Sequence, residues 1–357
     1  MTVLWLGPEA SEPTPLLWLK KSGGEWQSHS PRQVPFADVK GEAVHFHEFA
    51  NLSPGQIHHY ALSPERPGLT THIRLFQTLP DKLDAPFRFV TGGDMFHKRE
   101  WLDAMNLRAG LVSPRFALLG GDLAYANGRD PDRWRQWLDS WAVHAVTPEG
   151  LSVPMLPVIG NHEVNPRTRG WPAKAKFFHS LFLQPNEAEH TWRAVDVGSF
   201  LSFFLLDSDH GFPVRGPQTD WLAQNLSRRS ARPWLFACYH QPAYGTAKRP
   251  NLQVREHWVP LFQKHGLDAA FENDHHTYKR THPLLNGKRN ESDGVLYLGD
   301  GAWGVQTRPI SNPEQKTYLA KAESRRHLIL VTLTKEQATF EAIDANGTVF
   351  DRASARP

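Results

Sequence analysis

The N-terminal part of the chain alternates apolar and polar positions over short stretches. From residue 2 to about residue 79, such stretches are separated by turn-rich segments such as SGG and NLSPGQ. A period of two is typical of half-buried antiparallel strands, because successive side chains point to opposite faces of a sheet. The pattern predicts a small β-sandwich domain over residues 1–82, whose last residues belong to a linker at 80–86.

The pattern changes after the linker, where apolar runs alternate with amphipathic segments. Seven apolar runs end in glycine or polar residues: FRFVTGGD, FALLGGD, LPVIGNHE, LSFFLLDSD, WLFACYHQP, DAAFEND and VLYLGDG. Helices are predicted between them over residues 99–111, 130–146, 218–229 and 256–266. The second helix begins with Asp130 as N-cap and Pro131 at the first helical position.

Strands that alternate with helices predict an α/β class with buried parallel strands. The polar residues at the carboxyl ends of such strands are expected to converge in a crevice at the rim of the sheet. The chain closes with HLILVTL, ATFEAI and TVFDR, of which the last two are joined by an Asn346-Gly347 turn. We expect these three strands to form an antiparallel set that covers one side of the sheet.

Composition narrows the class of protein. With 357 residues, 40% apolar and 22% charged, the chain is core-forming, which excludes a disordered tail and a coiled coil. Lys and Arg outnumber Asp and Glu by 40 to 37 without a basic block, so nucleic-acid binding is not indicated. The longest apolar stretch, near residues 200–206, is far shorter than the roughly 20 residues that span a bilayer. Cys238 is the single cysteine, so no intrachain disulfide is expected.

The strand ends carry oxygen and imidazole donors. The candidates are Asp94, Asp122, Tyr125, Asn161, His162, His240, Asp274, His275 and His276. Such a mixture suits hard or borderline divalent and trivalent metal ions, and a thiolate site is excluded because Cys238 is alone. Asp122 is the expected bridging ligand between two ions, since a carboxylate has two oxygens. Taken singly, Asp94 and Asp122 also fit the simpler role of helix N-caps.

The order of these motifs resembles a calcineurin-like metallophosphoesterase of the purple acid phosphatase branch. The family pattern of Asp, GDxxY, GNH(D/E), a lone His and GHxH appears here as GGD, GGDLAY, GNHE, CYHQP and NDHHTYKRT, and covers about residues 85–310. The segment NLSPGQIHHY resembles the fibronectin-III-like domain that precedes the catalytic domain in that branch. The resemblance implies an α/β/β/α metallophosphoesterase sandwich over residues 83–357, preceded by an all-β fibronectin-III-like domain over residues 1–82.

The resemblance also implies a binuclear metal site. The first ion would be held by Asp94, Asp122, Tyr125 and His276. The second ion would be held by Asp122, Asn161, His240 and Asp274. A tyrosine with an ordinary pKa of about 10 binds as phenolate only beside a strong Lewis acid, so Fe(III) is expected at Tyr125, with divalent iron, zinc or manganese at the second position. Hydroxide between the ions would then attack phosphorus.

The remaining site residues are assigned roles around the substrate. His162 is expected to stabilise or protonate the leaving oxygen, with Glu163 orienting it. His97, one residue later than the histidine of the DxH motif, is expected to line the pocket, although an exposed loop histidine is an equal alternative. Tyr244, Lys248 and Arg249 lie in a polar loop after His240 and are also expected to contact a phosphate or a leaving group, although surface solubility explains the two positive charges equally well.

One motif departs from the family pattern, because GHxH reads Asn273-Asp274-His275-His276. In an extended backbone alternate side chains share a face, which groups Asp274 with His276 and favours Asp274 as the ligand. If the loop is irregular, His275 is the alternative ligand.

The sequence therefore predicts a hydrolase of small-molecule phosphate esters, with monoesters as the first candidate substrates. A phosphodiesterase or nucleotide hydrolase, or a catalytically weakened metal-binding scaffold, are the alternatives. No membrane partner is expected, and the oligomeric state is left open. No signal peptide is visible; the family resemblance favours the periplasm or the exterior if an upstream signal is missing from this chain, and otherwise the cytoplasm.

Overall fold

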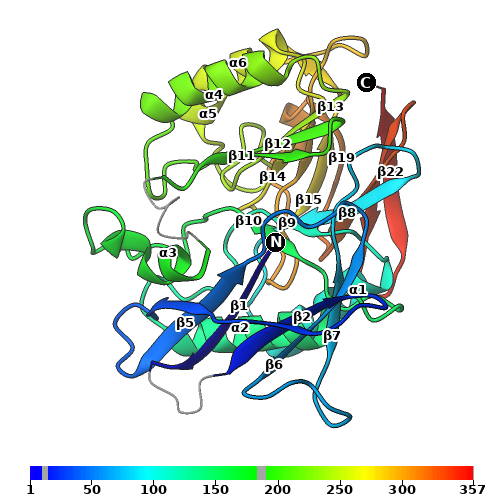
Figure 1. Ribbon diagram of the computed structural model, residues 1–357. Coiled ribbons are helices and arrows are strands. Elements are labelled where there is room, and N and C mark those ends of the chain that lie inside the picture. Colours follow the sequence, from blue (N-terminus) through cyan, green and yellow to red (C-terminus); the bar gives the residue numbers. More distant parts are fainter. Residues whose placement is uncertain (10–14, 183–189, 357) are drawn as a thin grey trace.

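The computed structural model describes residues 1–9, 15–182 and 190–356. Its N-terminal part is built from seven strands in two antiparallel sheets (Figure 1). One sheet has the order β1 (Thr2–Pro8), β5 (Glu42–Glu48), β4 (Arg32–Pro35), and the other β3 (Gln27–His29), β2 (Leu16–Lys21), β6 (Ile57–Ser63), β7 (Arg74–Gln77). A small apolar cluster that includes Leu17, Leu19, Phe49 and Phe76 is buried in this part. The predicted alternation of inward and outward side chains therefore produces a β-rich N-terminal domain.

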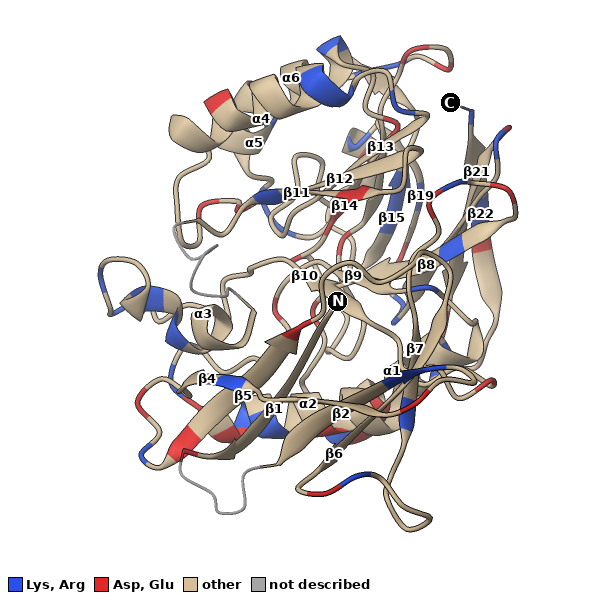
Figure 2. Ribbon diagram, in the orientation of Figure 1, with Lys and Arg blue, Asp and Glu red and all other residues tan. Residues whose placement is uncertain are grey.

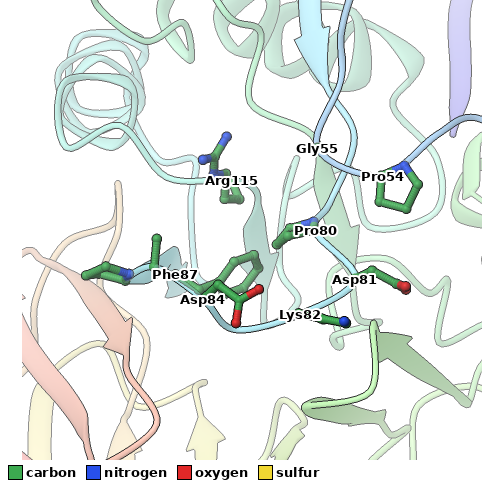
Figure 3. Close-up of a pocket in the computed structure, with 10 residues that line it drawn as sticks. Pro54, Gly55, Pro80, Asp81, Lys82, Asp84, Phe87 and Arg115 are labelled. Atoms are coloured by element: carbon green, nitrogen blue, oxygen red, sulfur yellow. The ribbon is translucent and has the colours of Figure 1, made fainter.

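The segment after β7 is irregular and packs against a turn of the N-terminal part. Residues 80–82 and 84–87 line a cavity of about 360 Å³ together with Pro54, Gly55 and Arg115 (Figure 3). The backbone N–H of Gly55 donates to the carbonyl of Leu79 at 3.2 Å. The predicted linker is thus held to its neighbours rather than extended into solvent.

The rest of the chain contains two larger sheets. The first has the order β10 (Met155–Pro157), β9 (Ala117–Leu119), β8 (Phe87–Gly92), β20 (Leu328–Leu333), β21 (Ala338–Ile343), β22 (Val349–Ala355). The second has the order β11 (Arg193–Val197), β12 (Leu201–Leu205), β13 (Trp234–Cys238), β14 (Ala269–Glu272), β18 (Leu296–Gly299), β15 (Tyr278–Thr281), β19 (Leu319–Glu323). A two-stranded ribbon, β16 (Leu284–Leu285) and β17 (Lys288–Arg289), completes the list. All seven apolar runs singled out in the sequence form strands of these two sheets, and they pair in parallel within each sheet.

The two sheets pack face to face through aromatic side chains. Phe89 of β8 meets Phe203 of β12 edge-on, with ring centroids 5.1 Å apart. Both belong to one buried cluster that draws side chains from both sheets. Alternate residues of the same strands, such as Val90 and Phe204, point away from this cluster into two outer ones. This alternation is why the inner strands are apolar on both faces.

Helices cover the two outer faces. The first outer cluster contains residues of α1 (Arg99–Leu111) and α2 (Pro131–His144), with α3 (Lys176–Phe182) beside them. The second contains residues of α4 (Pro217–Arg229), α5 (Leu252–His257) and α6 (Val259–Lys264). The order of layers is therefore helix, sheet, sheet, helix, which confirms the predicted α/β/β/α class.

Local capping explains where α2 begins. The Asp130 carboxylate accepts hydrogen bonds from the backbone N–H groups of Asp132 and Arg133 at 3.0 and 3.3 Å, and Pro131 occupies the first turn. These contacts satisfy donors that have no partner within the helix. The predicted N-cap is confirmed.

The predicted helix over residues 256–266 is confirmed in part, because the structure is helical on both sides of an interruption at Trp258 and the helical segment begins earlier than expected. The structure has α5 and α6 instead, separated at Trp258. Pro260 lacks a backbone N–H, and its ring clashes with the carbonyl four residues earlier, so a continuous helix is broken there. The earlier start at Leu252 is explained by Asn251, whose side chain caps the N–H groups of Gln253 and Val254.

The predicted placement of the C-terminal strands is wrong. β20, β21 and β22 are antiparallel, as expected, but they extend the first sheet instead of covering a face. β20 pairs with β8 from Ile329–Thr91 to Leu333–Phe87. The alternating burial of β20 into both the inner and the outer cluster requires this central position.

Two further observations concern the distribution of charged residues and the apolarity of the helices. Basic and acidic residues are interspersed over the described ribbon (Figure 2). Among the described residues, no helix is both long and apolar enough to cross a membrane.

Candidate metal centre

The candidate ligands lie directly after the carboxyl ends of parallel strands from both sheets. Asp94 follows β8, Asp122 and Tyr125 follow β9, Asn161 follows β10, His240 follows β13, and Asp274 and His276 follow β14. Because these strand ends meet at one edge of the two packed sheets, residues up to about 180 positions apart in sequence come into contact, as in the hydrogen bond of 2.8 Å from the Asp274 N–H to Asp94 Oδ2. The structure brings all seven together.

Five of these seven residues have a left-handed backbone. The φ angles of Asp94, Asp122, Tyr125, Asp274 and His276 lie between 53° and 74°. This region is sparsely populated by residues other than glycine, and each such residue costs about 1–3 kcal/mol unless its surroundings hold it. Such a concentration at one place is typical of a functional site. Asp94 and Asp122 are not N-caps of the helices that follow them, since α1 begins after Lys98 and α2 begins after Asp130.

The first half of the centre consists of Asp94, Tyr125 and His276. The Tyr125 hydroxyl lies 3.1 Å from Asp94 Oδ1 and 3.1 Å from His276 Nε2. His276 Nε2 is itself 3.0 Å from Asp94 Oδ1. These three atoms thus form a closed triangle, in which Asp94 and His276 are buried and Tyr125 is half-buried.

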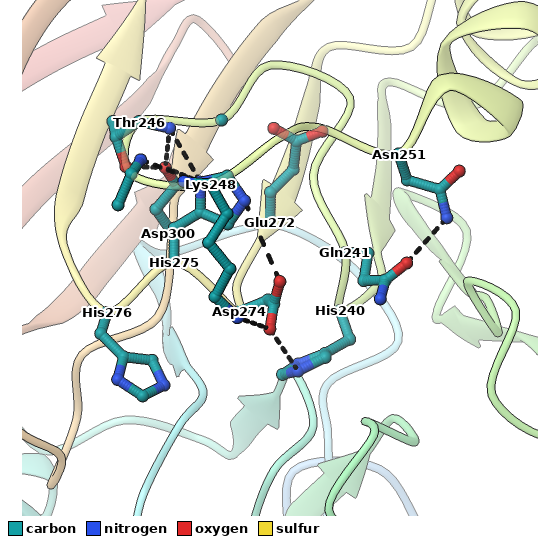
Figure 4. A network of polar contacts seen from close by, with 12 residues as sticks. His240, Gln241, Thr246, Lys248, Asn251, Glu272, Asp274, His275, His276 and Asp300 are labelled. Carbon is teal, nitrogen blue, oxygen red and sulfur yellow. Dashed lines mark hydrogen bonds and ion pairs between the residues drawn. The ribbon is translucent and has the colours of Figure 1, made fainter. Parts of the chain in front are cut away.

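The second half consists of Asp122, Asn161, His240 and Asp274. His240 Nε2 lies 3.2 Å from Asn161 Oδ1, 3.3 Å from Asp122 Oδ2 and 3.8 Å from Asp274 Oδ1. Figure 4 shows Asp274 between His240 and Lys248. Donor atoms of Asp94, Asp122 and His240 all lie within 4.8 Å of one another, which joins the two halves.

The orientation of the two candidate histidine ligands indicates which nitrogen faces the centre. His240 Nδ1 is 2.9 Å from the carbonyl of Gly120, and His276 Nδ1 is 3.1 Å from the carbonyl of Gln306. A carbonyl only accepts hydrogen bonds, so each Nδ1 carries a proton and directs Nε2 toward the carboxylates. Histidines that bind metal ions are commonly fixed in this way.

His275 has the opposite arrangement. Its Nδ1 accepts hydrogen bonds from the backbone N–H groups of Thr246 and Ala247 at 2.9 and 3.1 Å. Burial and the nearby Lys279 lower the pKa of His275 to about 3, so its ring is neutral with the proton on Nε2. A nitrogen that carries a proton has no lone pair for a metal ion.

The loop at residues 273–277 is irregular, which contradicts the premise of the sequence argument. Its residues form bends, and Asp274 and His276 are left-handed rather than extended. Asp274 and His276 nevertheless both face the centre, and His275 is turned toward the loop after His240. The grouping follows from two left-handed residues that flank His275, not from strand alternation.

The electrostatics of the cluster favour a bound cation. Burial lowers the pKa of His240, but the neighbouring Asp122 and Asp94 outweigh this effect and raise it to about 10. Burial raises the pKa of Asp122, and the contacts with His240 and His162 more than reverse this shift. A proton between these groups neutralises the carboxylates, and a metal ion that binds there must displace it.

Two glycines bring the backbone close to side chains in and beside the centre. A Cβ atom added to Gly301 would lie 1.8 Å from Asp94 Oδ2, and one added to Gly120 would lie 1.9 Å from Asn273 Nδ2. Glycine is therefore the only residue that fits at either position without moving the centre.

His162 lies beside the first half of the centre. Its ring stacks on Tyr125 with centroids 4.2 Å apart, and its Nε2 is 3.7 Å from Asp122 Oδ2. Its Nδ1 is 2.5 Å from Asn127 Oδ1, so Asn127 orients the ring. The expected orienting role of Glu163 is wrong, because this carboxylate accepts hydrogen bonds from the backbone N–H groups of Gly160, Asp122 and Leu123 instead.

The two predicted substrate residues differ in their surroundings. His97 is exposed, and its ring meets Tyr125 and His276 edge-on at 4.8 and 5.5 Å, so it lines the approach to the first half. Tyr244 is only 4% exposed, and its ring packs against Tyr297. This burial argues against a substrate contact by the Tyr244 side chain.

Sequence reasoning missed two contacts of the centre, because it did not single out Asn127 and it expected Lys248 at a phosphate or leaving group rather than at Asp274. Asn127 lies two residues after Tyr125, and its backbone is left-handed as well. Lys248 Nζ lies 2.5 Å from Asp274 Oδ1. Neither residue belongs to a recognisable motif, and a polar residue in a loop is by itself no signal of such contacts.

Comparisons with known proteins identify the family of the chain and some of its relatives. The family model described as calcineurin-like phosphoesterase matches residues 71–278. Purple acid phosphatase 15 of Arabidopsis thaliana is 24% identical over 287 residues, which cover 72% of this chain and 53% of that protein. A nucleotide pyrophosphatase/phosphodiesterase of Hordeum vulgare is 28% identical over 205 residues, which cover 50% of this chain and 52% of that protein. The chain thus spans about half the length of these curated relatives.

A solved structure shares the whole fold. The purple acid phosphatase from seeds of yellow lupin, Lupinus luteus, superposes with a TM-score of 0.82 and 18% identity, and covers 99% of this chain and 72% of its own. The chain belongs to the calcineurin-like phosphoesterase family.

Proposed function

We propose that this chain is a metal-dependent phosphatase with a binuclear centre. The observation that carries the proposal is the pair of histidines, His240 and His276, whose Nδ1 atoms are held by backbone carbonyls while both Nε2 atoms face buried carboxylates. Buried carboxylates and imidazoles that converge in this way are costly unless a cation lies among them. The family membership supports the same reading.

The proposed ligands follow the two halves of the centre. The first ion takes Asp94, Tyr125, His276 and one oxygen of Asp122, and the second takes Asp122, Asn161, His240 and Asp274. When bound, such ions activate water as a nucleophile and neutralise charge on the phosphoryl group.

Tyr125 makes the first half selective for a strong Lewis acid. Burial and the negative charge of Asp94 hold the pKa of Tyr125 well above its ordinary value. The phenol therefore loses its proton only to a highly charged cation, for which Fe(III) is the proposed occupant. Divalent iron, zinc or manganese is proposed for the second half, and an iron-bound tyrosinate would colour the protein.

His162 is the proposed proton donor to the leaving oxygen. Its side chain is 32% exposed, so it reaches solvent and substrate, unlike the buried ligands. Asn127 holds Nδ1, which leaves Nε2 free to face a substrate at the centre. His97 is proposed to border the same approach.

Phosphomonoesters are the proposed substrates. The printed name of the barley relative supports the alternative of diesters or nucleotides, because the loops around the centre, rather than the ligands, decide which ester is admitted. We also propose a domain boundary between residues 82 and 83 and a fibronectin-III-like first domain. The proposed location is the periplasm or the exterior if an upstream signal is missing from this chain, and otherwise the cytoplasm.

The test combines metal analysis with two chromogenic substrates. The purified chain should contain about two metal ions and cleave p-nitrophenyl phosphate faster than bis(p-nitrophenyl) phosphate. Asp122→Asn should reduce the rate by about 10³-fold, because metal ions contribute several kcal/mol of transition-state stabilisation. Asp84→Asn is the matched control, since the Asp84 side chain is 71% exposed and pairs only weakly with Lys335 at 3.2 Å.

The outcomes separate the rival functions. Faster cleavage of the diester would favour the phosphodiesterase alternative. A chain that binds metal ions and cleaves neither ester would favour the metal-binding scaffold. Full activity in Asp122→Asn would contradict the proposed centre.

A further inference from the structure

The loop after β13 places a protein cation on the second half of the centre. Lys248 Nζ lies 2.5 Å from Asp274 Oδ1, the same oxygen that faces His240 Nε2 at 3.8 Å (Figure 4). Asp274 is 6% exposed, whereas the Lys248 side chain is 39% exposed. A flexible, partly solvated ammonium group therefore contacts a nearly buried carboxylate from the outside.

The backbone beneath Lys248 is held firmly. Thr246 N–H donates to Asp300 Oδ2 and to His275 Nδ1, both at 2.9 Å. The Tyr318 hydroxyl donates to the carbonyl of Gly245 at 2.7 Å, and a Cβ atom at Gly245 would lie 2.0 Å from the His275 ring. The backbone at Gly245 and Thr246 is therefore held in place, while the Lys248 side chain is partly exposed.

The three carboxylates of the centre give this contact its importance. Asp94, Asp122 and Asp274 lie close together and are nearly buried, so positive charge is needed to offset them. The ammonium group of Lys248 supplies part of this positive charge without any metal ion. An ammonium group and a metal ion at Asp274 would repel each other at a few ångströms, and this repulsion weakens metal binding.

We infer that Lys248 competes with the second metal ion for Asp274, and so sets the second half to a weaker affinity than the first. The inference rests on the proposed function, because it assumes that Asp274 is a ligand. When the second ion binds, the ammonium group leaves Asp274 for solvent, which its exposed four-carbon side chain allows. Occupancy of the second half then depends on the concentration of metal around the protein.

The test measures metal binding by the metal-free full chain, with Mn²⁺ and Zn²⁺ titrated by calorimetry. Lys248→Met should tighten the weaker binding step by about 10-fold, the range in which residues behind a ligand act, and leave the tighter step unchanged. Lys248→Arg keeps the charge and should bind like the parent chain. Asp274→Asn should weaken the second step.

Arg249→Met is the matched control, because it removes the neighbouring exposed positive charge from the same loop without touching Asp274. It should change the second step by much less than Lys248→Met. Equal tightening in both variants would mean that general charge, not the contact with Asp274, sets the affinity.

The results distinguish this inference from the proposed function. If the parent chain binds two ions and cleaves phosphate esters, but Lys248→Met binds the second ion no more tightly, only the competition is overturned. Weaker binding by Lys248→Met would overturn it too, since Lys248 would then support the ion. A parent chain that binds no ions would overturn both.

Discussion

The two halves of the centre use similar donors but differ in their immediate surroundings. In the first half, Asp94, Tyr125 and His276 close into a triangle with sides of 3.0 to 3.1 Å. In the second half, Asp274 contacts Lys248, and its nearest approach to His240 is 3.8 Å. One half is thus arranged around a phenol that needs a strongly charged cation, and the other already contains a protein cation.

This difference indicates that separate residues control which kind of ion is bound and how strongly an ion is bound. In the proposed centre, Tyr125 would select the kind of ion, because burial and the charge of Asp94 raise its pKa and a strong Lewis acid is then needed to displace its proton. Lys248 sets how strongly the other ion is held, because it offsets the carboxylate that would bind it. The proposed functions of both halves can be tested independently.

Among the predictions that compare the halves, the largest effect is expected for His162, whose ring stacks on Tyr125 of the first half and whose Nε2 lies 3.7 Å from Asp122 Oδ2 of the second. His162→Ala should lower kcat by about 10²-fold with a smaller change in KM, the magnitude typical of a general acid. Burial lowers the pKa of His162 below its usual value. The protonated ring is then present only in acid, so kcat should fall as the pH rises through that lowered pKa, and His162→Ala should lack this fall. An unchanged pH profile in the variant would contradict the role.

The next largest effect is expected for substitutions that each remove a proposed ligand from one half only. Tyr125→Phe should lose the visible absorption band and bind the first ion at least 10-fold more weakly, a loss of the size seen when a contact of a metal site is removed. Asp274→Ala should keep the band and lose the second ion. Elemental analysis and a visible spectrum of each variant measure both.

His275→Ala is the control for that pair, because His275 faces the loop rather than the centre. It should retain both ions. If Asp274→Ala kept its second ion and His275→Ala lost it, His275 would be the ligand instead.

The smallest effect is expected for Asp268, which lies away from the centre. Asp268 lies just before β14, at the end opposite to Asp274, and accepts a hydrogen bond from the Leu235 N–H at 2.7 Å. Burial raises the pKa of Asp268 to about 7. Between about pH 4 and 7, Asp268 is protonated in the folded chain but ionised in the unfolded chain. The free energy of unfolding therefore decreases as the pH rises toward 7.

Asp268→Asn should therefore reduce the fall in Tm between pH 4 and 7 by a few degrees, as thermal unfolding would show. Metal content should stay unchanged. Asp84→Asn, at an exposed position, should follow the parent chain at every pH. A parallel loss of metal in Asp268→Asn would mean that the two ends of β14 are not independent.

Much of the fold is predictable because its signals are local. Continuous apolar runs identified all seven strands with polar ends, and Asp130 with Pro131 identified the start of α2. The helix predicted over residues 256–266 was confirmed only in part, because Pro260 interrupts a helix that the amphipathic pattern predicted as continuous. The C-terminal strands were recognised as strands, but their partner β8 lies about 240 residues earlier in the chain, and no local pattern identifies it.

The sequence alone determined which donor types stand at the strand ends and in which order, since strand alternation and motif spacing depend on near neighbours. Only the tertiary structure decided that Asp274 faces the centre while His275 supports a loop, because two left-handed residues, rather than an extended strand, orient them. It also decided that Asn127 holds His162 and that Lys248 reaches Asp274. These contacts join side chains from separate loops, and their distances are set by how the two sheets pack.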